Sequence, residues 1–281
     1  MLRDSRVHIG NQTAFSAPPL VPFLFAVEHG FDAFEFFPDG VPPYAGWSAT
    51  DLPPTTRAFV RGKAAEEGIR LSVHASLTCD LRTASGRNIF ERDADFARDI
   101  GARVVVVHID PTDVEAFAEA VLAVVDPLAS AGILLSIENT VGSGPDDFNT
   151  LFRTLQSLDR ARACHVGMCL DIGHANLHPS TRNRYLDYLD RLSSGVPIGH
   201  LHVHENWGDR DSHMTLFTGH AGRDPSGVEG LARRLSRRGF EGSWVMEQWP
   251  EPSSLLSVAR DRCLAILKVS ANEERTIAIG P

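Results

Sequence analysis

Apolar and polar positions follow two alternating patterns along the chain. Short runs rich in Val, Ile, Leu and Phe are each followed by a longer stretch with helical periodicity, often ended by glycine. The predicted strands cover residues 7–10, 31–37, 69–74, 103–108, 133–138, 165–171, 198–204 and 242–247. The predicted helices cover about 18–30, 55–67, 88–100, 112–131, 146–158, a stretch beginning near 179, 227–238 and 253–268.

Eight strands alternating with eight helices predict an α/β fold, a single (β/α)8 TIM barrel. We expect the barrel to span residues 1–270 and residues 271–281 to form a C-terminal tail, because the tail lacks periodicity. A doubly wound open sheet is the alternative, although no G-x-G-x-x-G follows the first strand. The residues that we expect to fill the barrel interior are Val73, Val105, Val107, Leu135, Ile137 and Met246.

Composition narrows the class of protein. Hydrophobic residues make up 43%, and no apolar run approaches the length of about 18 residues that spans a bilayer, so we expect a soluble protein. The charged N-terminus is unlike a signal peptide and the four cysteines form no Cys-x-x-Cys pair, which favours reduced thiols and a cytoplasmic location. The net charge of −9 argues against broad nucleic-acid binding. The oligomeric state stays open, a homo-oligomer included.

Six consecutive predicted strands end in a residue that can bind a metal or move a proton. These residues are His74, His108, Glu138, Asp171, His202 and Glu247. Because the C-terminal ends of barrel strands converge on one mouth, we expect the six side chains to be neighbours. His174, Asp211 and His213 follow in the loops after the sixth and seventh strands. One such residue at a strand end is usually a cap, but six in succession indicate a site.

The seventh predicted strand has the highest density of histidines. Residues two apart share a face of a strand, so His200, His202 and His204 face one side, while Leu201 and Val203 face the other. A solvent-exposed, histidine-rich edge is the alternative interpretation. A mixture of imidazoles and carboxylates favours Zn, Mn, Fe or Co over Ca or Mg. We therefore expect a divalent metal, Zn or Mn, as cofactor, with one to three ions.

Three motifs resemble the xylose-isomerase-like barrel superfamily, which includes sugar (phosphate) isomerases, ketose 3-epimerases and endonuclease IV. They are Ser136-Ile-Glu-Asn139, Leu170-Asp-Ile-Gly-His-Ala175, and His202-Val-His-Glu-Asn206 with Asp211-Ser-His213. Resemblance to the epimerases implies that Glu138, Asp171, His202 and Glu247 hold one metal. It also implies that Glu138 and Glu247 are catalytic and shuttle the proton beside a carbonyl.

Resemblance to endonuclease IV implies a different site, a trinuclear zinc centre. All nine of its ligand positions are matched here, by His74, His108, Glu138, Asp171, His174, His202, Asp211, His213 and Glu247. On this pattern Glu138 is a bridging ligand. The net negative charge argues against this branch. Two loops also depart from the endonuclease IV pattern. Residues 75–81 lack the tyrosine and asparagine of the DNA enzymes, and residues 214–218 are inserted before Gly219.

We favour a divalent-metal-dependent sugar isomerase or epimerase that transfers a proton through a metal-stabilised enediolate. The partner would then be a small carbohydrate, with Glu35, His204 and Trp207 as substrate-binding residues and Trp249 as a further wall. An endonuclease IV-like trinuclear zinc phosphodiesterase is the first alternative. A barrel that binds a metal or sugar without turnover is the second, and intact carboxylates at both Glu138 and Glu247 argue against it.

Overall fold

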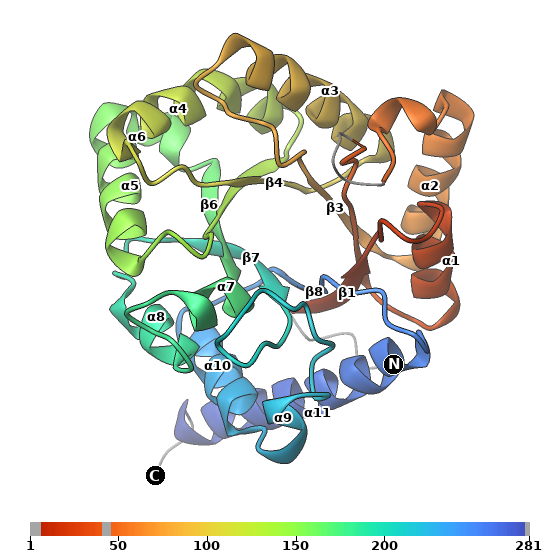
Figure 1. The fold of residues 1–281 in the computed structure, drawn as a ribbon, viewed down its shortest axis with the longest axis vertical. Coiled ribbons are helices and arrows are strands. Elements are labelled where there is room, and N and C mark those ends of the chain that lie inside the picture. The colour runs from red at the N-terminus through yellow and green to blue at the C-terminus, as the bar shows by residue number, and fades with distance from the viewer. Residues whose placement is uncertain (1–6, 41–45, 279–281) are drawn as a thin grey trace.

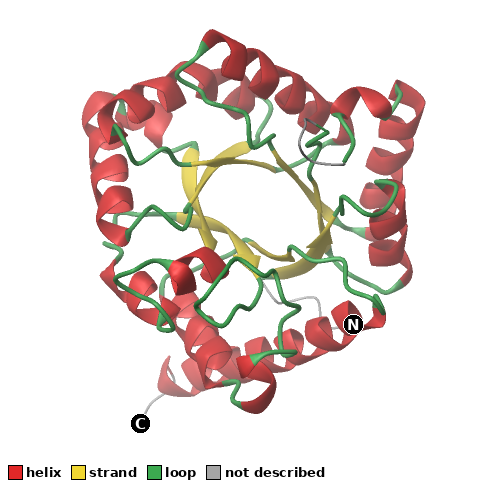
Figure 2. Cartoon of the chain, in the orientation of Figure 1, coloured by secondary structure: helices red, strands yellow, loops and turns green. Residues whose placement is uncertain are grey.

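Eight parallel strands close into a barrel, in chain order from β1 to β8. The computed structural model describes residues 7–40 and 46–278, with their side chains through residue 270. Figures 1 and 2 show the strands as a central ring and the helices as an outer layer around it. The predicted single (β/α)8 barrel is therefore confirmed, and the open sheet is excluded. Within the described ranges, no helix combines the length and the apolarity that crossing a membrane requires.

The elements follow the predicted order. The strands are β1 (His8–Gln12), β2 (Ala33–Phe36), β3 (Arg70–His74), β4 (Val104–His108), β5 (Leu134–Glu138), β6 (Val166–Asp171), β7 (Ile198–Val203) and β8 (Ser243–Met246). The helices are α1 (Leu20–Glu28), the 3-10 turn η1 (Ala49–Asp51), α2 (Pro54–Glu67), α3 (Ala84–Ile100), α4 (Val114–Ser130), α5 (Pro145–Leu158), α6 (Arg160–Ala163), α7 (Ile172–Leu177), α8 (Tyr185–Arg191), α9 (His220–Arg223), α10 (Ser226–Arg237) and α11 (Ser254–Ala278).

Two of the predicted helices differ from the observed ones. The helix expected near residue 179 is two short helices, α7 and α8, and α7 begins directly after β6. Helix α11 continues past residue 270 to Ala278, so the predicted tail is helical up to that residue. Residues 279–281 of the predicted tail lie outside the described residues.

Local sequence signals explain where several helices begin and end. Helices α2 and α3 stop at Gly68 and Gly101, whose φ angles of 70° and 74° lie in the left-handed region. At the N-termini, the side chain of Thr83 accepts a hydrogen bond from Gly86 N, and that of Asp113 accepts one from Ala116 N. The two glycine ends lead into β3 and β4, whereas the two N-terminal caps begin the helices that follow these strands.

The strand register brings the predicted site residues to one level. His108 pairs with Glu138 across β4 and β5, and Asp171 pairs with His202 across β6 and β7. Since alternate side chains of a strand point to opposite faces, residues two positions before the site also face the interior. They include Val106 and Cys169, which form a small apolar cluster with Val104 and Leu134. Cys169 is fully buried there.

The prediction for the barrel interior is wrong by one residue in each of the four strands that it named, β3, β4, β5 and β8. Val73, Val105, Val107, Leu135, Ile137 and Met246 belong to the large core shared with the helices. The physical reason is the period of two: because His74 points into the barrel, Val73 must point outward toward the helices. Phe90 of α3 and Leu128 of α4 are among the helical members of that core.

Because β1 lies close to β2, we expect a larger side chain at Gly10 to destabilise the protein. A Cβ added to Gly10 would lie 2.5 Å from the carbonyl oxygen of Ala33, a backbone atom that cannot move aside alone. We expect Gly10→Ala to lower the free energy of unfolding by about 1–3 kcal/mol in urea denaturation.

The matched control is Gly62→Ala in α2, where an added Cβ has no neighbour within 4 Å. Because alanine restricts the unfolded chain and favours the helix, this variant should be unchanged or more stable by roughly 0.4–1 kcal/mol. Equal stability of the two variants would contradict the close packing of β1 on β2.

Candidate metal and active site

Three imidazoles converge on one oxygen of Glu138 at the C-terminal mouth of the barrel. Glu138 Oε2 lies 3.0 Å from His74 Nε2, 3.4 Å from His108 Nε2 and 3.2 Å from His202 Nδ1. His202 Nδ1 is also 3.2 Å from Glu247 Oε1. His74, Glu138, His202 and Glu247, called the strand group below, offer ligand atoms within 4.8 Å of one another.

Asp171 lies beside the strand group and is held by its neighbours. Its backbone N–H donates to Asn139 Oδ1 at 2.8 Å, and Asn139 Nδ2 donates to the carbonyl of Asp171 at 2.9 Å. Asp171 Oδ1 also caps α7 by accepting from His174 N at 2.6 Å. Asn139, the last residue of the Ser-Ile-Glu-Asn motif, thus ties β6 to the end of β5. Asp171 shares one candidate group with Glu138 and His174, and another with His204 and Glu247.

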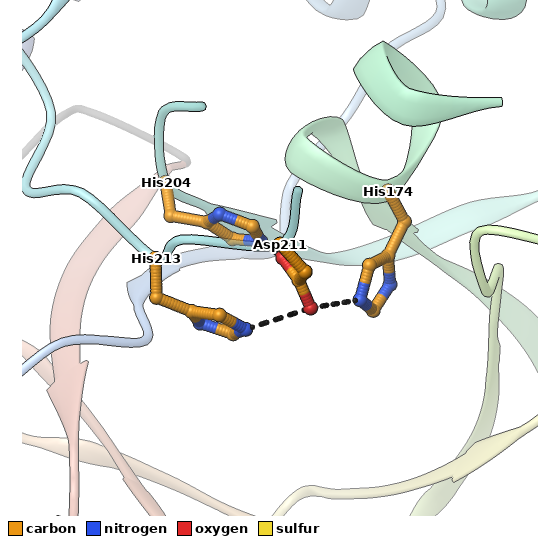
Figure 3. A group of neighbouring side chains, drawn as sticks. All are labelled: His174, His204, Asp211 and His213. Atoms are coloured by element: carbon orange, nitrogen blue, oxygen red, sulfur yellow. Dashed lines mark hydrogen bonds and ion pairs between the residues drawn. The ribbon is translucent and has the colours of Figure 1, made fainter. Parts of the chain in front are cut away.

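A second cluster lies next to Asp171 and consists of His174, His204, Asp211 and His213, called the loop group below (Figure 3). His174 Nε2 and His213 Nε2 each lie 3.1 Å from Asp211 Oδ2. The rings of His204 and His213 stack with centroids 4.1 Å apart. His213 has a φ of 43°, a left-handed conformation that is strained for a residue with a Cβ.

Gly173 is required by the loop group. A Cβ at this position would lie 2.0 Å from Cε1 of His204. The Gly-His pair after Asp171 therefore serves two purposes: the glycine makes room for one imidazole, and the histidine supplies another.

Burial and neighbouring charges shift the pKa values of the two glutamates in opposite directions. Burial would raise the pKa of Glu138, but the charges of His202 and His108 hold it well below its usual value. Burial raises the pKa of Glu247 to about 7; the negative charges of Asp171 and Glu138 add to this effect, and His202 opposes it. Glu138 is thus ionised near neutral pH, whereas Glu247 is close to its midpoint.

The loop group is an ion-paired set of side chains. Burial alone would lower the pKa of His213, yet its hydrogen bond to Asp211 and the charge of Glu247 raise the value to about 9. Burial would raise the pKa of Asp211, but hydrogen bonds from His174 and His213 lower it. Protons on these imidazoles therefore occupy positions where a metal cation would compete with them.

The donor set fits a divalent cation. His202 Nδ1, Glu138 Oε1 and Glu247 Oε2 are buried and form no hydrogen bond with any described part of the chain. Buried polar atoms normally have such partners, and imidazole nitrogens with carboxylate oxygens are typical ligands of Zn and Mn. Seven of the nine residues predicted as metal ligands lie in the strand group or the loop group. Of the other two, His108 is in ion-pair contact with Glu138, and Asp171 shares a candidate group with Glu138 and His174.

A cavity of about 490 Å³ opens above Glu138, within the range typical of small-ligand pockets. Phe37 and Trp249 form apolar parts of its wall, and Gln12 is a polar part. Sequence reasoning missed Gln12 because it ended the first strand at Gly10, whereas β1 continues to Gln12. The signal was present in the polar Asn-Gln-Thr that follows Gly10.

The predicted substrate residues lie elsewhere. Glu35 is fully buried in the barrel interior, where it hydrogen-bonds His200 and His202 at 2.9 Å each, and it does not line the cavity above Glu138. Burial would raise the pKa of Glu35, but His202 and His200 hold it well below its usual value. Trp207 is 53% exposed and lines, with the buried His204, a separate cavity of about 340 Å³ beside α9 and α10. Neither Trp207 nor His204 lines the cavity above Glu138.

Known proteins resemble this chain in sequence and in structure. An uncharacterized protein of Sinorhizobium fredii, y4fM, is 27% identical over 154 residues, in a match that covers 50% of this chain and 47% of y4fM. The chain thus spans about half the length of the curated relative that it matches.

Two solved structures share the fold. The first is a D-tagatose 3-epimerase-like protein with a TM-score of 0.71 and 19% identity, covering 96% of this chain and 100% of the other. The second is an L-ribulose 3-epimerase with a TM-score of 0.70 and 16% identity, covering 98% and 100%. A family model described as xylose isomerase-like TIM barrel matches residues 23–263. Because that match covers most of the chain, the protein belongs to the xylose isomerase-like TIM barrel family.

Proposed function

We propose that this protein is a divalent-metal-dependent isomerase or epimerase of a small sugar or sugar derivative. The observation that carries the proposal is the placement of two glutamates around one imidazole nitrogen. Glu138 Oε2 and Glu247 Oε1 each lie 3.2 Å from His202 Nδ1, at the floor of the mouth cavity. Two carboxylates on separate strands, β5 and the end of β8, can approach a bound substrate from two sides.

Glu138, Asp171, His202 and Glu247 would hold the cation, Zn or Mn. A bound cation supplies Lewis-acid polarisation of a carbonyl, a contribution of several kcal/mol. The epimerases with the same fold support a carbohydrate as substrate.

Proton transfer falls to the two glutamates. One removes a proton from the carbon beside the carbonyl, and the other returns a proton to the opposite face or to the adjacent carbon. Gln12 Nε2 donates to Glu247 Oε1 at 3.3 Å and so limits the rotation of that carboxylate. Phe37 and Trp249 border the cavity and reduce the access of water to the reacting carbon.

A trinuclear zinc phosphodiesterase or hydrolase is the second candidate. The loop group in Figure 3 favours it, because His174, Asp211 and His213 provide ligands that a single-metal epimerase does not need. His74 and His108 would bind the remaining ion with Glu138 as the bridge. Metal content separates the candidates, since one equivalent per chain supports the isomerase and three support the hydrolase.

Metal binding provides the first test of the proposed function. Protein purified without added metal should contain Zn or Mn by elemental analysis, and Asp171→Ala should lose it. Removing a direct ligand should weaken binding by more than the roughly 10–100-fold typical of outer contacts. Asp159→Ala, which removes an exposed cap of α6, is the control and should retain the metal. Unchanged metal content in Asp171→Ala would refute the assignment of this ligand.

The reaction itself is tested by exchange with solvent. With a ketose substrate in deuterated water, the enzyme should incorporate deuterium at the carbon next to the carbonyl. Glu138→Gln and Glu247→Gln should each lower the rate by about 10²–10⁴-fold, because each removes one proton carrier. Mass spectrometry of the recovered sugar measures the exchange. Cleavage of an abasic-site oligonucleotide at enzyme-like rates, without exchange across a broad sugar panel, would favour the hydrolase instead.

A further inference from the structure

Glu35 is the centre of a hydrogen-bond network beneath the strand group. Its Oε1 accepts from His202 Nε2 at 2.9 Å and from Gln12 Nε2 at 3.0 Å. Its Oε2 accepts from His200 Nε2 at 2.9 Å and from Ser72 Oγ at 2.8 Å. All five residues are buried and project from barrel strands or their ends. The network therefore has little freedom to rearrange.

This network determines which nitrogen of His202 carries the proton. An ionised carboxylate only accepts hydrogen bonds, so the proton of a neutral His202 must lie on Nε2, which faces Glu35. Nδ1 then has a free lone pair. That nitrogen lies 3.2 Å from both Glu138 Oε2 and Glu247 Oε1, and it has no hydrogen-bond partner among the residues that the structure describes.

We propose that Glu35 is a positioning residue of the metal centre: it holds His202 in the tautomer and ring orientation that present Nδ1 to the cation. Gln12 extends the same function to a second ligand, since its Nε2 donates both to Glu35 Oε1 and, at 3.3 Å, to Glu247 Oε1. Histidine ligands typically need such a partner on the second ring nitrogen, because it orients the ring and strengthens the bond to the metal. The inference rests on the cation of the proposed function.

A purely structural role for Glu35 makes a different prediction. Removing Glu35 would then lower stability without changing metal affinity in the protein that still folds. Ser72→Ala is the matched control, because it deletes a hydrogen bond to Glu35 Oε2 and leaves both bonds to Oε1 in place.

Zn and Mn affinities, measured by competition with a chromophoric chelator, distinguish the two roles. We expect Glu35→Ala to weaken binding by about 10–100-fold. Glu35→Gln should lose less, because its amide oxygen can still accept from His202 Nε2, and Ser72→Ala should resemble the wild type. Affinity of folded Glu35→Ala within about threefold of the wild type would overturn the inference, since known outer contacts contribute at least about tenfold.

A second measurement removes the dependence on a folded Glu35→Ala variant. In ¹⁵N NMR spectra of the metal-loaded wild type, His202 should carry its proton on Nε2, and a proton on Nδ1 would overturn the inference. Wild-type protein that binds neither cation would refute the proposed function together with the role of Glu35. Tight wild-type binding that folded Glu35→Ala fully retains would refute only the role of Glu35.

Discussion

A carboxylate buried away from water must be compensated by a positive charge or by several donors, and this requirement organises the barrel from its interior to its mouth. Glu35 lies among two imidazoles, a hydroxyl and an amide, while Glu138 lies among three imidazoles at its Oε2. His202 contacts both carboxylates through its two nitrogens. One imidazole thus connects the interior network to the candidate metal ligands, so the position of either carboxylate depends on the other.

This arrangement changes what fills the barrel. Interiors of this fold are usually layers of bulky branched side chains, but here Ser72, Ser136 and His200 are buried at positions that such residues would occupy. Among the residues that the structure describes, Val104, Val106, Cys169 and the adjoining Leu134 form a small apolar cluster there. Apolar burial is instead concentrated between strands and helices, where Val105 and Leu135 pack. Apolar packing between the strands and the helices therefore stabilises the fold. The barrel interior can then hold polar side chains that support the site.

Sequence reasoning located the mouth of the barrel correctly because the relevant signals are local. Each strand ends where its apolar run ends, so His74 and Glu138 could be assigned to strand ends without knowledge of the fold. It placed Val73 on the wrong face by overlooking that an inward His74 turns its neighbour outward. The burial of Glu35 and the location of Trp207 at a separate cavity were not anticipated, for another reason. The depth of β2 within the barrel and the path of the long loop after β7 are set by tertiary packing, which leaves no periodic signal in the sequence.

The two candidate functions differ in the part of the structure on which they depend. The strand group projects from regular barrel strands or their ends, and its four members are linked by contacts of His202 and Glu138. The loop group depends on the segment that carries Asp211 and His213, and His213 adopts a strained left-handed backbone conformation. Strain of this kind persists only where surrounding contacts impose it, and it concentrates at functional sites. Both groups therefore have a structural indication of function. The strand group, unlike the loop group, is held in place by the barrel strands themselves. Glu138 and Glu247 are therefore the firmer basis for proposing a reaction.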